Sequence, residues 1–143
     1  MKKKMLILLF ASLISSNTWA EGKTAEQLVL SKKKADMTYQ QLMEIMGRSY
    51  GMINDGILRE NKQMVKVGAD FILTHPAPNH KPWLIVEKAE HGNFKQSLLA
   101  FDEILDTQTK SVLEAVKTEN WVEAGKAAHD LMDSCVSCHA MWK

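Results

Sequence analysis

The sequence predicts an all-α protein folded as an antiparallel four-helix bundle. Helix-forming residues, chiefly Ala, Leu, Lys, Glu, Gln and Met, dominate the chain of 143 residues. Apolar side chains recur at helical spacing in four segments, and long alternating runs of β-branched residues are absent. All three prolines lie within residues 76–82, so they interrupt the chain at one place only. A single domain of this length can bury a sizeable core.

The first 20 residues differ from the rest of the chain. Lysines at positions 2–4 precede an apolar run over residues 5–14, and Thr18-Trp19-Ala20 follows. This order is typical of a secretory signal peptide, and the apolar run is shorter than the ~20 residues that span a bilayer. An uncleaved membrane anchor is the alternative. We expect cleavage after Ala20, export to the periplasm, and one domain over residues 21–143 without stable membrane insertion.

The charge balance limits the classes of partner. The whole chain has 18 Lys and Arg against 17 Asp and Glu, and removal of three lysines with the signal peptide leaves 15 against 17. Because nucleic-acid binding requires a clear basic excess, no nucleic-acid partner is expected. No Ser/His/Asp or paired-carboxylate pattern suggests hydrolysis, and we do not expect an enzyme.

The first two predicted helices cover about residues 25–52 and 56–73. Thr24 and Gln27 before the first helix fit a capping box, in which each side chain accepts a free backbone N–H. The short link at residues 52–56 favours antiparallel neighbours. Apolar residues at helical spacing in the two segments include Ala35, Tyr39, Leu42, Met43, Met46, Tyr50, Ile57, Met64, Phe71 and Ile72.

A loop over residues 74–92 separates the two halves of the bundle, because its prolines cannot donate backbone hydrogen bonds. The third helix is expected to start at Asn93 as its N-cap. After the sequence KTEN, Asn120 and Glu123 resemble a second capping pair at the start of the fourth helix. The apolar stripes of these two helices comprise Phe94, Leu98, Phe101, Leu105, Val112, Val116, Trp121, Ala124, Ala128, Leu131, Met132, Cys135 and Cys138.

Both cysteines of the sequence lie near its end, in Cys135-Val136-Ser137-Cys138-His139. At about 100° per residue on a helix, the two cysteines lie about 60° apart, and His139 lies about 40° from Cys135. The three side chains therefore share one face. The pattern C-x-x-C-H is typical of haem c attachment, in which two thioether bonds hold the porphyrin and the histidine ligates iron. We predict one haem c, bound covalently through Cys135 and Cys138, with His139 as an iron ligand.

Three other interpretations of the cysteine pair remain open. A disulfide across C-x-x-C would close only a tiny loop and add little stability, although export would permit it. A thioredoxin-like redox pair usually begins a helix beside a strand, whereas this pair lies in the last turns of a helical chain. A zinc site would need further convergent ligands, and the sequence has no second cysteine pair.

The sequence SCVSCHAMWK, at the end of an exported four-helix chain, resembles the class II c-type cytochromes. These include the cytochromes c′ and the low-spin cytochromes of the c-556 kind. The resemblance covers residues 21–143 in layout and is specific at the haem motif. It implies an antiparallel four-helix bundle around one haem, with His139 as the fifth iron ligand. It also implies Lys143 as the basic residue near the haem, with a solvated terminus as the alternative, and Trp142 as the common aromatic.

The sixth iron ligand separates the functions known in this family. A thioether gives six-coordinate, low-spin iron suited to electron transfer, whereas an apolar residue leaves the iron open to small gases. The family's distal residue lies on the first helix, often four residues after a basic one. Alignment of Ser49-Tyr50-Gly51 with a similar pair in the family implies Met43 as this ligand, although Tyr39 stands where the basic residue is usual. Other candidates are Met46, His75, His80 and His91.

We therefore expect a periplasmic electron-transfer cytochrome with His139 and Met43 as iron ligands. Its partners would be redox proteins of the periplasm. The charges of Lys32, Lys33 and Lys34 are candidates for docking them, although an ordinary solvated face is the more usual role of such charges. A homodimer formed through a helix face would be usual for the family. One alternative is a five-coordinate cytochrome c′ that binds nitric oxide or carbon monoxide. Another is a haem-free helical binding module with a C-terminal disulfide.

Overall fold

The computed structural model describes residues 22–142 and is mainly helical in that range. Its helices are α1 (Ala25–Ser31), α2 (Tyr39–Leu58), α3 (Lys62–Thr74), α4 (His91–Lys117) and α5 (Trp121–Trp142). Two short strands, β1 (Lys34–Ala35) and β2 (Ala77–Pro78), pair in parallel, and 3-10 turns at Pro82–Ile85 and Lys88–Glu90 lie between α3 and α4. The mainly helical class is thus confirmed.

Two sequence predictions fall outside the described residues. The expected signal peptide, residues 1–20, is one, and Lys143 is the other. Within the described part of the chain, no helix has both the length and the apolar composition needed to cross a membrane.

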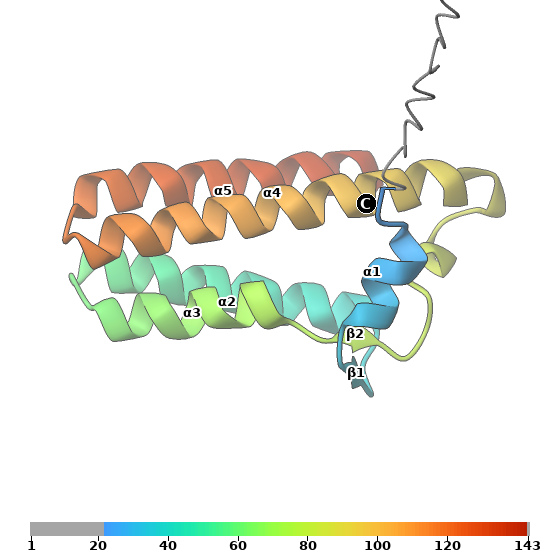
Figure 1. The fold of residues 1–143 in the computed structure, drawn as a ribbon, viewed down its shortest axis with the longest axis horizontal. Helices are drawn as coiled ribbons and strands as arrows, with labels where there is room; N and C mark the ends of the chain where they lie inside the picture. Colours follow the sequence, from blue (N-terminus) through green and yellow to red (C-terminus); the bar gives the residue numbers. More distant parts are fainter. Residues whose placement is uncertain (1–21, 143) are drawn as a thin grey trace, which may run out of the picture.

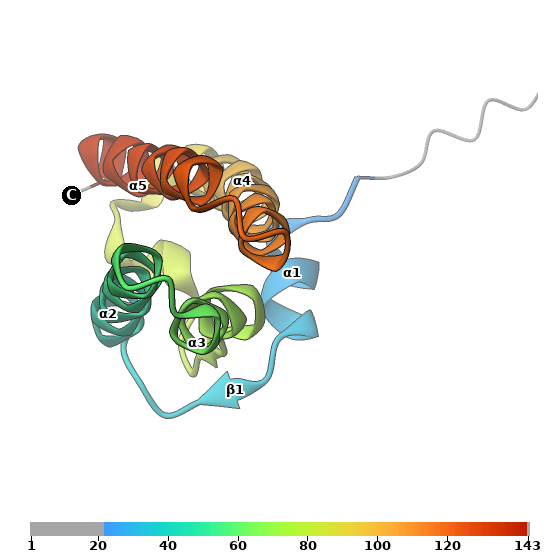
Figure 2. The ribbon, with the colours of Figure 1, turned by 90° about the vertical axis from the view of Figure 1, so that its left-hand side faces the viewer.

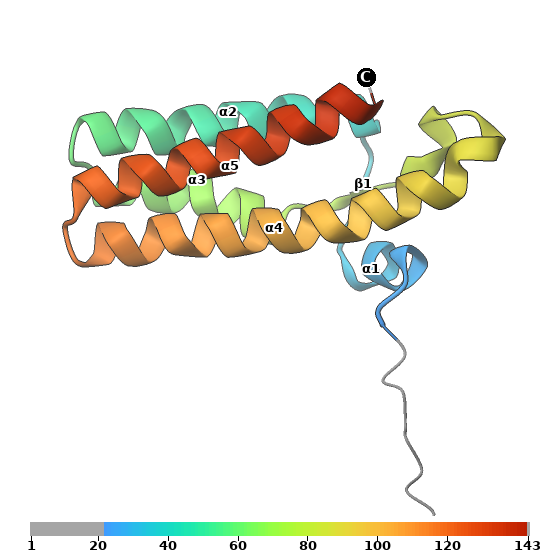
Figure 3. The ribbon, with the colours of Figure 1, turned by 90° about the horizontal axis from the view of Figure 1, so that it is seen from above.

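The four long helices lie side by side (Figure 1). The chain turns back on itself between α2 and α3 and again between α4 and α5, and these two pairs make the most extensive contacts. Seen end-on, α2 and α3 lie on one side and α4 and α5 on the other, with α1 beside the edge formed by α3 and α4 (Figure 2). Figure 3 shows α1 and the α3–α4 connection at the end of the molecule where α5 terminates.

Two apolar clusters hold these elements together. The larger one lies between the four long helices and contains fully buried Leu42, Ile53, Val65, Val112 and Leu131. The smaller one joins α1, the α3–α4 connection and the start of α4 through Ala25, Val29, Ala77, Trp83 and Phe94. The second cluster fixes α1 against the end of the long helices.

The single helix predicted over residues 25–52 is wrong, because the chain forms α1 and α2 instead. The Thr24–Gln27 capping box is confirmed, with the Gln27 N–H donating to Thr24 Oγ1 at 3.2 Å. An equivalent box starts α2, where the Gln41 N–H donates to Thr38 Oγ1 at 3.1 Å. Between the two helices, β1 pairs with β2. The second box and this pairing satisfy backbone groups that a continuous helix would otherwise use.

The link predicted at residues 52–56 is also wrong. Helix α2 continues to Leu58, and the turn before α3 lies at residues 59–61. Glu60 there has a left-handed φ of 52°. The Asn61 side chain then caps α3 by accepting the Met64 N–H at 3.0 Å. A cap with this geometry fixes the start of α3 at Lys62 rather than at residue 56.

The later boundaries agree better with the sequence prediction. Residues 75–90 form the expected connection, with short helical turns within it. Helix α4 starts at His91, and Asn93 is not its N-cap, because its side-chain amide donates to Glu90 Oε2 at 3.0 Å. The Asn120 cap is confirmed, since Asn120 Oδ1 accepts the Glu123 N–H at 3.2 Å.

Candidate cofactor site

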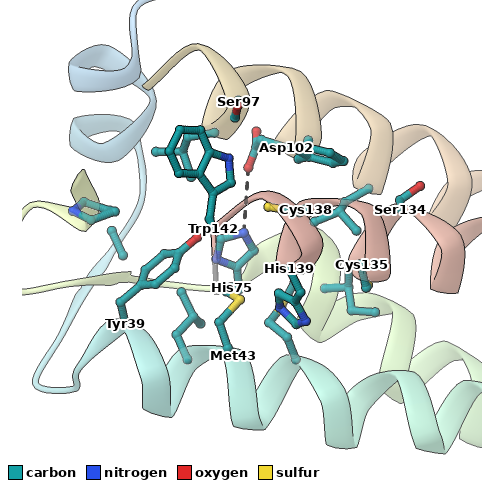
Figure 4. A pocket seen from close by; sticks show the side chains of 18 of the residues that line it. Tyr39, Met43, His75, Ser97, Asp102, Ser134, Cys135, Cys138, His139 and Trp142 are labelled. Atoms are coloured by element: carbon teal, nitrogen blue, oxygen red, sulfur yellow. Dashed lines mark ion pairs between the residues drawn. The ribbon is translucent and has the colours of Figure 1, made fainter. Parts of the chain in front are cut away.

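A cavity lies where α2, α4 and α5 meet the α1 end of the molecule (Figure 4). Its volume is about 170 Å³, and it opens to solvent at its mouth. The walls are mostly apolar and include Leu28, Val29, Leu42, Met46, Ile72, Phe94, Leu98, Phe101 and Leu105.

Helix α5 brings all three residues of the C-x-x-C-H motif to this cavity. Cys135, Cys138 and His139 line it together, as their spacing on one helix face predicts. The two cysteines are half-buried and unpaired, whereas His139 is exposed at the cavity wall. One face of α5 therefore presents two thiols and an imidazole to the same space.

The environment of the two thiols keeps them protonated. Burial raises the pKa of Cys135, and burial together with the charge of Cys135 raises the pKa of Cys138. Zinc ligation and disulfide exchange both use the thiolate form, which a raised pKa disfavours. Within residues 22–142, no group of three or more His, Cys, Asp or Glu side chains is arranged to hold a metal ion.

Helix α2 forms the wall that faces the motif. Met43 points from α2 towards α5, while His139 points from α5 towards α2 (Figure 4). Both residues also line a second hollow at the cavity mouth, together with Tyr39. Met46 reaches the cavity too, but it belongs to the buried core cluster. Of the two methionines, Met43 is the one that borders both the cavity and its mouth.

The three histidines of the connection are held by other protein groups. His75 lines the cavity, with Nε2 2.8 Å from Lys32 Nζ and Nδ1 3.0 Å from the Pro76 carbonyl oxygen. His80 Nε2 accepts the Tyr39 N–H at 3.1 Å. His91 Nε2 lies 3.2 Å from the carbonyl oxygen of Val86. These contacts engage the imidazole nitrogens, and only His75 of the three lines the cavity.

One corner of the cavity is polar and charged, which sequence reasoning missed. Lys32 Nζ lies 2.9 Å from Asp102 Oδ1 and 2.8 Å from His75 Nε2. The Lys32 side chain is only 16% exposed, so the prediction that Lys32 is an exposed surface charge is wrong. The three residues come from the end of α1, the end of α3 and the middle of α4. No local pattern in the sequence indicates such a contact.

The charge of Asp102 is stabilised in this corner. Burial opposes its ionisation, but His75 and Lys32 outweigh burial and lower the pKa of the carboxyl to about 2. His75 Nε2 lies 3.7 Å from Asp102, which is too long for a hydrogen bond. We therefore assign Lys32, at 2.9 Å, as the main partner of Asp102.

Trp142 closes the cavity beside this corner. Its ring packs edge-on against Phe94, with ring centroids 5.2 Å apart. Its indole Nε1 is buried and has no hydrogen-bond partner within the described part of the chain. A buried donor without an acceptor is unusual in folded proteins, and a ligand is one group that would satisfy it.

Comparison with known proteins gave no relative. No protein-family model, curated protein or solved structure matches this chain. The resemblance to class II cytochromes therefore depends on the haem motif and its position in the chain. The function proposed next depends on the residues of the site.

Proposed function

We propose that the protein is an exported, monohaem class II c-type cytochrome that transfers electrons in the periplasm. The observation that carries this proposal is the position of the haem motif. Cys135, Cys138 and His139 line one mostly apolar cavity in a mainly helical chain. The group attached to both cysteines would be one haem c.

The residues of the cavity suit a covalently bound haem. Two protonated thiols on one helix face are the groups that thioether attachment consumes. Apolar walls suit a flat hydrophobic macrocycle, and the unsatisfied indole N–H of Trp142 suits a ligand that carries acceptor oxygens. An imidazole and a thioether, from His139 and Met43, flank the same space from α5 and α2.

The haem, its two protein ligands and the apolar walls would each contribute to electron transfer. Haem supplies a one-electron couple at its iron. His139 and Met43 would be the protein ligands of the iron, and a Met/His pair raises the reduction potential. The apolar walls would exclude water and hold the two ligands in place. With both residues as ligands, the protein would carry electrons and leave no site for a small gas.

The wider architecture belongs to the same proposal. Helices α2–α5 would form an antiparallel four-helix bundle over the domain at residues 21–143, with the cofactor between facing helices. The signal peptide at residues 1–20 would direct the chain to the periplasm, where cytochrome maturation and redox partners are found. Exposed Ile85 at the cavity mouth is a candidate contact for such a partner, or for a second copy of the chain.

The optical spectrum tests this function. The exported protein would be measured oxidised, reduced, and reduced with carbon monoxide. We expect a sharp reduced α-band that carbon monoxide leaves unchanged. A broad spectrum that responds to carbon monoxide would instead indicate a five-coordinate, gas-binding cytochrome c′. A chain without haem bands would favour the helical binding module with a C-terminal disulfide.

A further inference from the structure

The polar corner of the cavity contains hydrogen-bond donors that the protein itself does not use. Lys32, His75 and Asp102 form a charged cluster at a wall that is otherwise mostly apolar, and Trp142 lines the same cavity. In Figure 4, Trp142 and Asp102 lie on the same side of the cavity, away from Met43. The cavity is therefore amphipathic, with its charge concentrated on one side.

This corner of the cavity lacks acceptors for two of its hydrogen-bond donors. A lysine ammonium has three N–H donors. Lys32 directs one to Asp102 Oδ1 at 2.9 Å and one to His75 Nε2 at 2.8 Å, so a third remains. The indole N–H of Trp142 is buried and has no acceptor among residues 22–142. Two donors, one of them cationic, thus remain for an acceptor that enters the cavity.

The matching acceptor is a carboxylate. Charge-assisted hydrogen bonds from a lysine to a carboxylate are roughly twice as strong as neutral ones. An acceptor here would also satisfy the buried indole N–H of Trp142, and a buried donor without a partner is costly. Haem carries two carboxylates on one edge of an otherwise apolar ring, which matches a cavity whose charge lies on one side.

We propose that Lys32 and Trp142 form a carboxylate-binding subsite, which takes a propionate of the haem. This inference depends on the function proposed above. Asp102 and His75 position the Lys32 ammonium, and Trp142 adds a directed neutral donor.

Resonance Raman spectra of the haem-loaded protein test the subsite through the propionate bending band. We compare the unaltered protein with Trp142→Phe and Lys32→Met. The matched control is Trp121→Phe, which changes a partly buried tryptophan of α5 that does not line the cavity. We expect the band to shift in both Trp142→Phe and Lys32→Met and to stay in place in the control.

A second measurement needs no substitution at Lys32. In the reduced, haem-loaded protein, the indole N–H of Trp142 should exchange with solvent more slowly than that of Trp121. Its NMR signal is identified by its loss in Trp142→Phe. An unshifted Raman band in Trp142→Phe together with rapid indole exchange would overturn the subsite while leaving the cytochrome in place. Absence of haem bands from the unaltered protein would overturn both proposals.

Discussion

Met43 and His139 line one cavity from opposite helices, so a change at residue 43 separates electron transfer from gas binding. We predict that Met43→Leu opens the sixth coordination position. The reduced spectrum should then respond to carbon monoxide, and the midpoint potential should fall, because a thioether ligand raises it. Spectra with and without carbon monoxide, and a redox titration, measure these effects.

Met52→Leu is the matched control for this prediction. Met52 is also on α2, but it is exposed and does not line the cavity. The control should keep the unaltered spectrum. If Met43→Leu also keeps it, Met43 is not a ligand, and the same test moves to Met46.

Asp102 should make stability depend on pH in the acid range. Its folded pKa is about 2, below the ~3.9 of an unfolded aspartate, so its contribution is fully present above pH ~4 and is lost as the pH falls towards 2. Allowing for solvent screening, we predict that Asp102→Asn lowers the free energy of unfolding by about 1–2 kcal/mol at pH 7. The difference from the unaltered protein should shrink between pH 4 and pH 2.

Urea unfolding at pH 7, 4 and 2 measures this contribution. Asp130→Asn provides the control, because Asp130 is an exposed residue of α5. It should change the free energy of unfolding little at any of these pH values. An equal loss in both variants would show that the Lys32 contact adds no stability.

At the scale of elements, Gly68 sets how closely α3 approaches α2. A Cβ at this position would collide with the Ser49 carbonyl oxygen and lie 3.0 Å from Ile53 Cγ1. We predict that Gly68→Ala lowers the free energy of unfolding by about 1–3 kcal/mol, because the helices must move apart. Gly51 on α2 has no atom within 4 Å of such a Cβ. Gly51→Ala should instead stabilise the helix by up to about 1 kcal/mol, and equal effects in urea unfolding would refute this packing account.

The helix boundaries show which elements a sequence can specify. Local signals correctly predict three features, namely the Thr24–Gln27 box, the Asn120 cap and the proline-containing connection. The break between α1 and α2 was missed, although Thr38 and Gln41 carry the same capping pattern as Thr24 and Gln27. Helical spacing of apolar residues continues across the break and concealed it. The pairing of β1 with β2 joins distant segments, so no local pattern indicates it.

The candidate site was predictable only in part, for the same reason. Cys135, Cys138 and His139 follow one another on a single helix, so their spacing alone predicts that they share a face. The cluster of Lys32 and Asp102 joins α1 to α4, and only the folded chain brings these two residues together. The sequence therefore predicts the chemistry of attachment, while the polar corner of the cavity emerges from the fold.

At the scale of the whole molecule, the cavity is a mostly apolar space among helices that otherwise pack closely. Helix α1 and the α3–α4 connection close one end of it through the smaller apolar cluster. A ligand that binds only the folded chain stabilises it, so the proposed haem would add to the stability of the fold.

The intact mass of the exported, denatured protein tests the central claim most directly, because only a covalent group survives denaturation. The account predicts the mass of residues 21–143 plus one haem, and loss of that increment when Cys135 and Cys138 are both replaced by alanine. A mature chain that weighs no more than its amino acids would contradict the attachment of haem, and with it the proposed function.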